Sequence, residues 1–147
     1  MANTIQYGTR NRDGIISEHH IARVPSWVYA RGMTFTTREP SITVYRVVRE
    51  DQFSKNHAGE AVTEWAELPA DAAVQFGIAD ASGEVTKTYN PDEGNNLLLV
   101  LHAHTGEGHD HGHGHDGGRI VFRAVTVDHR DLPIAPVTEW TPLYPVA

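Results

Sequence analysis

The alternation of apolar and polar residues along the chain predicts strands over most of its length. Residues 33–37 and 41–48 are rich in β-branched and aromatic residues, which favour extended structure. Apolar side chains alternate again in residues 74–79, and the turn at 80–83, Asp-Ala-Ser-Gly, followed by residues 84–89, predicts a β-hairpin. The middle of the chain is therefore expected to form antiparallel sheet.

The second half adds two long apolar segments with an unusual stretch between them. Residues 97–101 are continuously apolar and predict a central strand buried on both sides, and residues 119–127 are the last long predicted strand. Residues 105–118, rich in histidine and glycine, are expected to be the long hairpin loop that joins these two strands. Helical patterns are weaker and occur at residues 17–23 and 58–68. The expected fold is mainly β, an antiparallel two-layer β-sandwich of the immunoglobulin-like or jelly-roll-like kind.

A chain of 147 residues has the length of a single domain, so residues 1–147 are expected to fold as one β domain. Residues 1–30 are interpreted as an N-terminal arm and the proline-rich residues 131–147 as an extended C-terminal arm. Trp140 and Tyr144, together with a leucine between them, are candidate anchors. Such an arm lies either along its own domain or on another copy of the chain.

A short sequence occurs twice. Residues 62–65 and 137–140 both read Val-Thr-Glu-Trp, and a leucine follows three positions later in each case, at Leu68 and Leu143. Four identical residues are too few to establish a duplicated domain. The favoured interpretation is a pair of edge segments that each pin a tryptophan into a groove, and the alternative is an anchor for a neighbouring subunit.

Composition excludes several classes of function. The formal net charge is −7 and no Lys/Arg run is present, which argues against nucleic acid as a partner. The longest apolar run, at residues 97–101, is far too short for membrane insertion, and the N-terminus lacks the apolar centre of a signal peptide, so synthesis in the cytoplasm is expected. Because cysteine is absent, any metal must be held by His, Asp, Glu or backbone oxygen.

Histidines give the chain its most specific chemistry. Six of the ten are gathered in a stretch of fourteen residues with acids and glycines between them: His102, His104, His109, His111, His113 and His115. Neutral imidazole is a common ligand for zinc, nickel and copper, so this set is the candidate metal site, with a Zn, Ni or Cu ion as the only expected cofactor if there is one. Adventitious metal binding by a solvated loop is the alternative.

His102 and His104 would point to one face if the apolar strand continued through them. With Glu107 they give H-x-H-x-x-E, which resembles the first metal-binding motif of the cupins, and His129 would then be the last ligand. The motif departs from the cupin pattern in its missing glycine and early glutamate. The distal histidines alternate with glycine, which suits storage, delivery or bridging better than turnover. Since no hydrolase, phosphate-loop or dinucleotide motif occurs, we expect no enzyme.

Residues 31–35, Arg-Gly-Met-Thr-Phe, and the hairpin at 73–85 resemble the immunoglobulin-like domains of phage tail and baseplate proteins. The likeness covers roughly residues 30–127. It implies a virion location and a structural subunit without catalytic residues, which contacts other copies of itself or other assembly subunits. The expected function is therefore a non-enzymatic subunit of a repetitive assembly with a projecting, metal-binding loop. The alternatives are a metal buffering or delivery module and a small cupin-like metalloenzyme.

Overall fold

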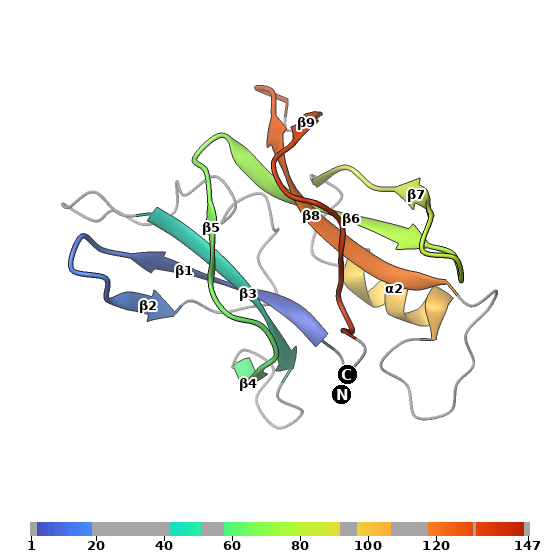
Figure 1. Cartoon of the computed structure of the whole chain (residues 1–147), viewed down its shortest axis with the longest axis horizontal. Helices are drawn as coiled ribbons and strands as arrows, with labels where there is room; N and C mark the ends of the chain where they lie inside the picture. Colours follow the sequence, from blue (N-terminus) through green and yellow to red (C-terminus); the bar gives the residue numbers. More distant parts are fainter. Residues whose placement is uncertain are drawn as a thin grey trace.

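Two antiparallel sheets form most of the structure. The computed structural model describes residues 3–18, 42–50, 58–91, 97–106, 118–130 and 132–145. The first sheet occupies the left half of Figure 1 and the second the right half, with the helix α2 behind the second sheet. The fold is thus mainly β and antiparallel, as the sequence predicts. The strand expected at residues 33–37 lies outside the described residues.

The first sheet is centred on two long strands. Its members are β1 (Asn3–Arg10), β2 (Ile16–Glu18), β3 (Ile42–Glu50), β4 (Ala58–Ala61) and β5 (Ala66–Leu68). The order is β2-β1-β3-β4, and β5 pairs with β3 as well. The helix predicted at residues 58–68 is wrong, because these residues contain two short strands that pair with β3.

The second sheet follows in the sequence and repeats the same order. Its members are β6 (Ala72–Ala79), β7 (Val85–Thr88), β8 (Arg119–Val127), β9 (Pro133–Pro136) and β10 (Thr141–Pro142). β7 pairs with β6, β6 with β8, and both β9 and β10 pair with β8. The predicted hairpin is confirmed as β6 and β7, and the last long strand as β8.

The apolar run after this hairpin is a helix and not the predicted strand. The helix α2 (Leu97–Thr105) contains five leucine or valine residues in a row followed by His-Ala-His, and leucine and alanine have high helix propensity. Gly106 ends the helix with φ 75°, and its N–H donates to the carbonyl of His102 at 2.9 Å. Residues 105–118 therefore join a helix to β8, and the expected hairpin of two strands is wrong.

The two terminal segments belong to the sheets. β1 pairs with β3 over its full length and is buried almost throughout, although residues 1–30 were expected to form an arm. The C-terminal segment is extended and lies along its own domain, where β9 and β10 pair with β8. Leu143 is fully buried, and its N–H donates to the carbonyl of Ile120 at 2.9 Å. The start of β1 contacts the C-terminal segment, since the backbone N–H of Asn3 donates to the Tyr144 hydroxyl at 2.8 Å.

The two sheets are copies of one structural unit. β1 and β6 correspond, as do β3 and β8, β4 and β9, and β5 and β10, and in both sheets the strands pair in the same way. Residue 45 pairs with residue 66 in the first sheet, and residue 122 pairs with residue 141 in the second. We call residues 3–68 the first repeat and residues 72–143 the second repeat. The duplicated Val-Thr-Glu-Trp sequence is part of this larger duplication.

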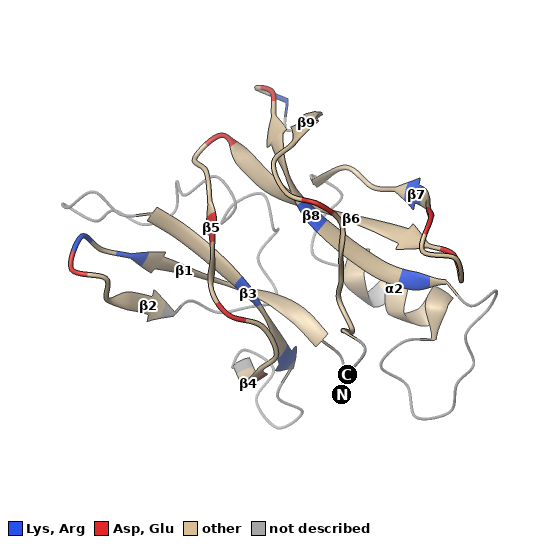
Figure 2. Cartoon of the chain, viewed as in Figure 1, with Lys and Arg blue, Asp and Glu red and all other residues tan. Residues whose placement is uncertain are grey.

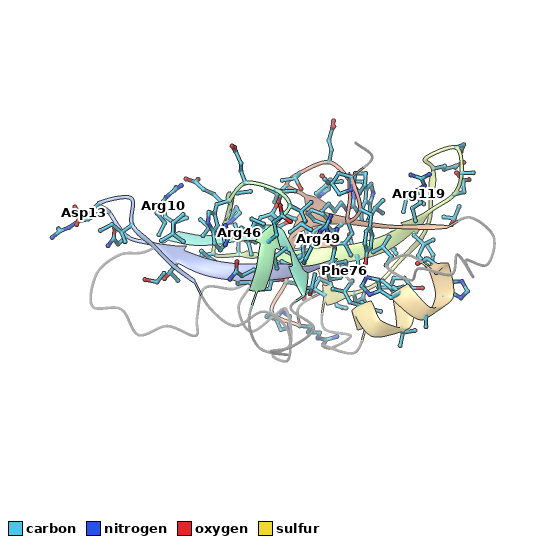
Figure 3. The ribbon with its side chains drawn as sticks, turned by 90° about the horizontal axis from the view of Figure 1, so that it is seen from below. Arg10, Asp13, Arg46, Arg49, Phe76 and Arg119 are labelled. Atoms are coloured by element: carbon cyan, nitrogen blue, oxygen red, sulfur yellow. The ribbon has the colours of Figure 1, made fainter. Side chains whose placement is uncertain are left out.

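Corresponding residues of the two repeats meet in a shared core. Tyr45 of β3 and Phe122 of β8 occupy the same position in their repeats, and their rings pack edge to face with centroids 6.4 Å apart. The ends of the sheets lie far apart: Figure 3 shows Arg10, the last residue of β1, towards one end of the molecule and Arg119, the first residue of β8, towards the other. The two repeats are therefore related by an approximate twofold axis near the Tyr45–Phe122 contact.

Candidate functional site

The predicted histidine site begins in the last two turns of α2, where the structure separates its first two members. His102 is 6% exposed, whereas His104 is exposed to solvent. Two residues apart on a helix correspond to a rotation of about 200°, so the two side chains leave the helix in nearly opposite directions. The expectation that both point to one face of a strand is wrong, because the segment is helical.

His102 is engaged by the chain's own C-terminal segment. Its Nε2 lies 2.8 Å from the hydroxyl of Tyr144, and the two rings pack edge to face. The same hydroxyl accepts the backbone N–H of Asn3 at 2.8 Å, and the side-chain amide of Asn3 donates to the carbonyl of Leu143 at 2.9 Å. Because Nε2 faces Tyr144, a metal ion at this atom would have to displace the tyrosine.

Of the other predicted ligands, the structure describes only His129. His109, His111, His113 and His115, and also Glu107, lie outside the described residues. His129 is exposed in the turn after β8, whereas α2 ends beside the beginning of that strand. A nine-residue strand is about 30 Å long, so His129 is far from His102. Within the described residues, no group of three His, Asp or Glu side chains is placed to hold a metal ion.

A polar network that the sequence did not indicate is built in the same way in both repeats. In the first repeat, Arg46 on β3 donates from Nε to the side-chain oxygen of Gln6 on β1 at 2.8 Å. The guanidinium carbon of Arg46 lies 4.2 Å from the ring centroid of Trp65. The Trp65 ring in turn covers Gly8, where an added Cβ would lie 3.2 Å from the indole. The tryptophan thus closes over the sheet where β1 has no side chain.

The second repeat contains the same arrangement at corresponding positions. Arg123 on β8 donates to Gln75 on β6 at 2.9 Å, and its guanidinium lies 4.2 Å from the Trp140 ring centroid. Gly77 lies beneath that ring, and a Cβ there would lie 3.1 Å from the indole. Each arginine is held by a hydrogen bond on one side and by a cation–π contact on the other. This agrees with the interpretation that each Val-Thr-Glu-Trp segment pins a tryptophan.

The threonine of each repeated segment fixes the segment to the central strand. The backbone N–H of Val47 donates to the Thr63 hydroxyl at 2.9 Å, and the N–H of Ala124 donates to the Thr138 hydroxyl at 2.9 Å. A side-chain hydrogen bond also joins Thr138 of the second repeat to Tyr45 of the first. Burial raises the pKa of Tyr45, and this bond acts in the opposite direction.

The turns that follow β1 and β6 also correspond. The side-chain oxygen of Asn11 accepts the N–H groups of residues 13 and 15, and that of Asp80 accepts those of Ser82 and Glu84. The glycine of each turn, Gly14 or Gly83, has a positive φ, which glycine adopts without strain. The Ser82 hydroxyl, followed by the backbone N–H groups of the turn, holds the pKa of Asp80 below its usual value.

Comparison with known proteins gives no match: no family model, no curated protein and no solved structure resembles the chain. None of the helical structure in the described residues is long and apolar enough to cross a membrane.

Proposed function

We propose that the chain is a non-enzymatic structural subunit of a larger repetitive assembly, of the phage tail, baseplate or capsid-surface type, with a virion location. Residues 102–115 supply a histidine-rich segment that can bind a divalent transition metal. A two-layer packing of the sheets, of the immunoglobulin-like or jelly-roll-like kind, belongs to the same proposal and is supported by the shared core.

The observation that carries the proposal is the use of the same polar side chains in both repeats. A glutamine, an arginine, a tryptophan and a threonine hold each sheet together through matching contacts. Charged and aromatic groups of these kinds often bind substrates, but here they stabilise the scaffold twice over. This use of polar groups supports a structural role better than a catalytic one.

The histidine-rich segment is attached to this scaffold at two neighbouring points. Residues 107–117 follow Gly106, which ends α2, and precede Gly118, which begins the approach to β8. A Cβ on Gly118 would lie 3.7 Å from the Thr105 side chain, so the two attachment points are close together. Replacing residues 107–117 by a short Gly-Ser linker should therefore leave the sheets intact.

The second candidate function is a metal buffering or delivery module. It is favoured by the exposure of His104 in the last turn of α2, because the first of the four distal histidines, His109, follows five positions later in the sequence. Such a module would need the histidine-rich segment, whereas a structural subunit would assemble without it. No comparable observation favours a catalytic cupin-like site, because its first two ligands, His102 and His104, leave α2 in nearly opposite directions.

Native mass spectrometry of untagged protein, prepared without metal-affinity resin, separates these functions. The structural subunit predicts a defined multimer, and the protein in which 107–117 are replaced by the linker should form the same multimer. A wild-type monomer with stoichiometric metal, lost on this replacement, would overturn the structural proposal and establish the metal module.

A further inference from the structure

The chain joins the two repeats on only one side of the approximate twofold axis. Residues 69–71 connect the buried Leu68, the last residue of the first repeat, to the buried Ala72, the first residue of the second. On the other side, the last residue of the second repeat, Leu143, lies beside the first residue of the first repeat, Asn3, whose side-chain amide donates to its carbonyl at 2.9 Å. These two residues are 140 positions apart in the sequence. Noncovalent contacts therefore hold the second crossing between the repeats.

The same backbone donor is satisfied at both crossings, but by different acceptors. At the covalent crossing, the N–H of Ala72, the first residue of β6, donates to the carbonyl of Pro69 at 3.0 Å. At the noncovalent crossing, the N–H of Asn3, the first residue of β1, donates to the side-chain hydroxyl of Tyr144 at 2.8 Å. Pro69 and Tyr144 each directly follow the last leucine of their repeat. The Tyr144 side chain thus replaces the carbonyl that closes the covalent turn.

His102 of α2 holds this tyrosine in place. Its Nε2 lies 2.8 Å from the Tyr144 hydroxyl, and the two rings pack edge to face with centroids 5.7 Å apart. Because the hydroxyl oxygen already accepts the N–H of Asn3, its own hydrogen can be donated to Nε2. The imidazole then accepts at Nε2 and carries its hydrogen on Nδ1. We call Asn3, His102 and Tyr144 the terminal junction.

We propose that the terminal junction takes the place of a covalent linker, and that His102 is a positioning residue of this junction and not a metal ligand. A metal ion binds the imidazole nitrogen that carries no hydrogen, and Tyr144 occupies that nitrogen here. His102 is also only 6% exposed, whereas His104 is exposed. The metal-binding histidines therefore begin at His104. This last assignment rests on the proposed metal-binding segment, whereas the terminal junction does not.

The surroundings of the terminal junction suit a neutral imidazole. The three segments that supply its side chains, residues 3–9, 97–105 and 140–145, contain no Lys, Arg, Asp or Glu. In Figure 2, the start of β1 and the last described segment of the chain are accordingly tan. Burying a charge without a paired charge is costly. A neutral His102 with one accepting nitrogen fits these surroundings.

Hydrogen exchange of the full chain, followed by nuclear magnetic resonance, tests the terminal junction. Tyr144→Phe removes the hydroxyl and should speed the exchange of the Asn3 and Leu143 amides about tenfold relative to that of Ala72 at the covalent crossing. Tyr89→Phe is the matched control, because Tyr89 is also half-buried but lies outside the junction. Acceleration at Asn3 and Leu143 that is no greater than at Ala72, or no greater than in Tyr89→Phe, would overturn the proposal.

The hydrogen position on His102 gives a second, spectroscopic test. Long-range proton–nitrogen spectra distinguish the two imidazole tautomers, and the signals of His102 are identified by their loss in His102→Gln. We expect the hydrogen on Nδ1. A hydrogen on Nε2 would leave no accepting nitrogen for Tyr144 and would overturn the junction.

Calorimetric titration with Ni²⁺ tests the ligand assignment. His102→Gln keeps an acceptor for Tyr144 in the amide oxygen and removes the imidazole, so it should bind Ni²⁺ as tightly as the wild type. His104→Gln, the matched change on the exposed side of α2, should bind it about tenfold more weakly. Equal weakening by both changes would overturn the assignment of His102 and leave the metal-binding function standing. A wild-type protein that binds no Ni²⁺ would overturn that function, and the exchange and tautomer measurements would still decide the terminal junction.

Discussion

The two repeats have the same interior and different surfaces. In both, an arginine lies between a glutamine and a tryptophan, and a glycine lies under the indole ring. Outside this framework they diverge. Arg10 and Glu67 form an ion pair in the first repeat, and Ala79 and Pro142 occupy the corresponding positions in the second. The comparison separates residues that the fold requires from residues that are free to serve interactions.

The sharpest test of the shared interior is the leucine that ends each repeat. Leu68 and Leu143 are 1% and 0% exposed and occupy corresponding positions. Changing either one to alanine should lower the free energy of unfolding by about 2–5 kcal/mol, because each leaves a cavity in the same core. Chemical denaturation measures both variants, and a cost below about 0.5 kcal/mol for only one of them would break the equivalence.

The glycines beneath the tryptophans should be the next most sensitive positions. A Cβ at Gly8 would lie 2.9 Å from the Ser17 carbonyl oxygen, and one at Gly77 would lie 2.8 Å from that of Lys87. Each alanine variant should therefore cost about 2–3 kcal/mol through crowding against backbone and indole. Thermal unfolding of both alanine variants beside the wild type checks this expectation. Tolerance of alanine at Gly8 or Gly77 would contradict the close packing of the ring.

Removing the threonine hydroxyls should have a smaller effect and should reveal a difference between the repeats. Thr63→Val and Thr138→Val each leave a backbone N–H without its acceptor, which costs about 1–2 kcal/mol. Thr138→Val should cost more, because it also removes the bond to Tyr45. A double-mutant cycle with Tyr45→Phe measures that extra contribution, and a coupling energy of zero would show that the Tyr45 bond adds nothing.

The smallest expected effect is a pH dependence of stability at the turn after β6, in the second repeat. Because the pKa of Asp80 is lowered in the folded protein, its contribution to stability is present above its ordinary pKa of 3.8 and is lost as pH falls through the lowered folded value. Asn11, at the corresponding turn, does not titrate. Hydrogen exchange of the two turns in acid should therefore show loosening at Gly83 but not at Gly14. Asp80→Asn should abolish this difference, and equal loosening of both turns would count against it.

The sequence predicts the strands with clear alternation and misses those without it. β3, β8 and the β6–β7 hairpin are visible because their apolar residues alternate or are β-branched. β1 is not visible, because polar residues such as Thr4 and Gln6 are buried in it beside a partner strand almost forty residues away. The apolar run at residues 97–101 predicts a strand, but a continuous apolar run fits a buried helix equally well. Only its packing against β8 and the helix end at Gly106 identify it as a helix.

The candidate site was predictable only in part for a similar reason. The histidines stand together in the sequence, but Tyr144, which contacts His102, is forty-two residues away. The duplication left a visible trace only at Val-Thr-Glu-Trp, a contiguous segment that contains the threonine and the tryptophan of each network. Its other members, such as Gln6 and Arg46, are single residues on separate strands, so only the pairing of the strands brings them together.

The equivalence of the two repeats can be measured in one sample by nuclear Overhauser spectroscopy of the arginine and tryptophan side chains. We expect contacts from Arg46 to Trp65 and from Arg123 to Trp140, with upfield-shifted arginine methylene resonances in both cases, because each guanidinium lies over an indole ring. Contacts in one repeat and none in the other would contradict the claim that the chain is built from two copies of one unit.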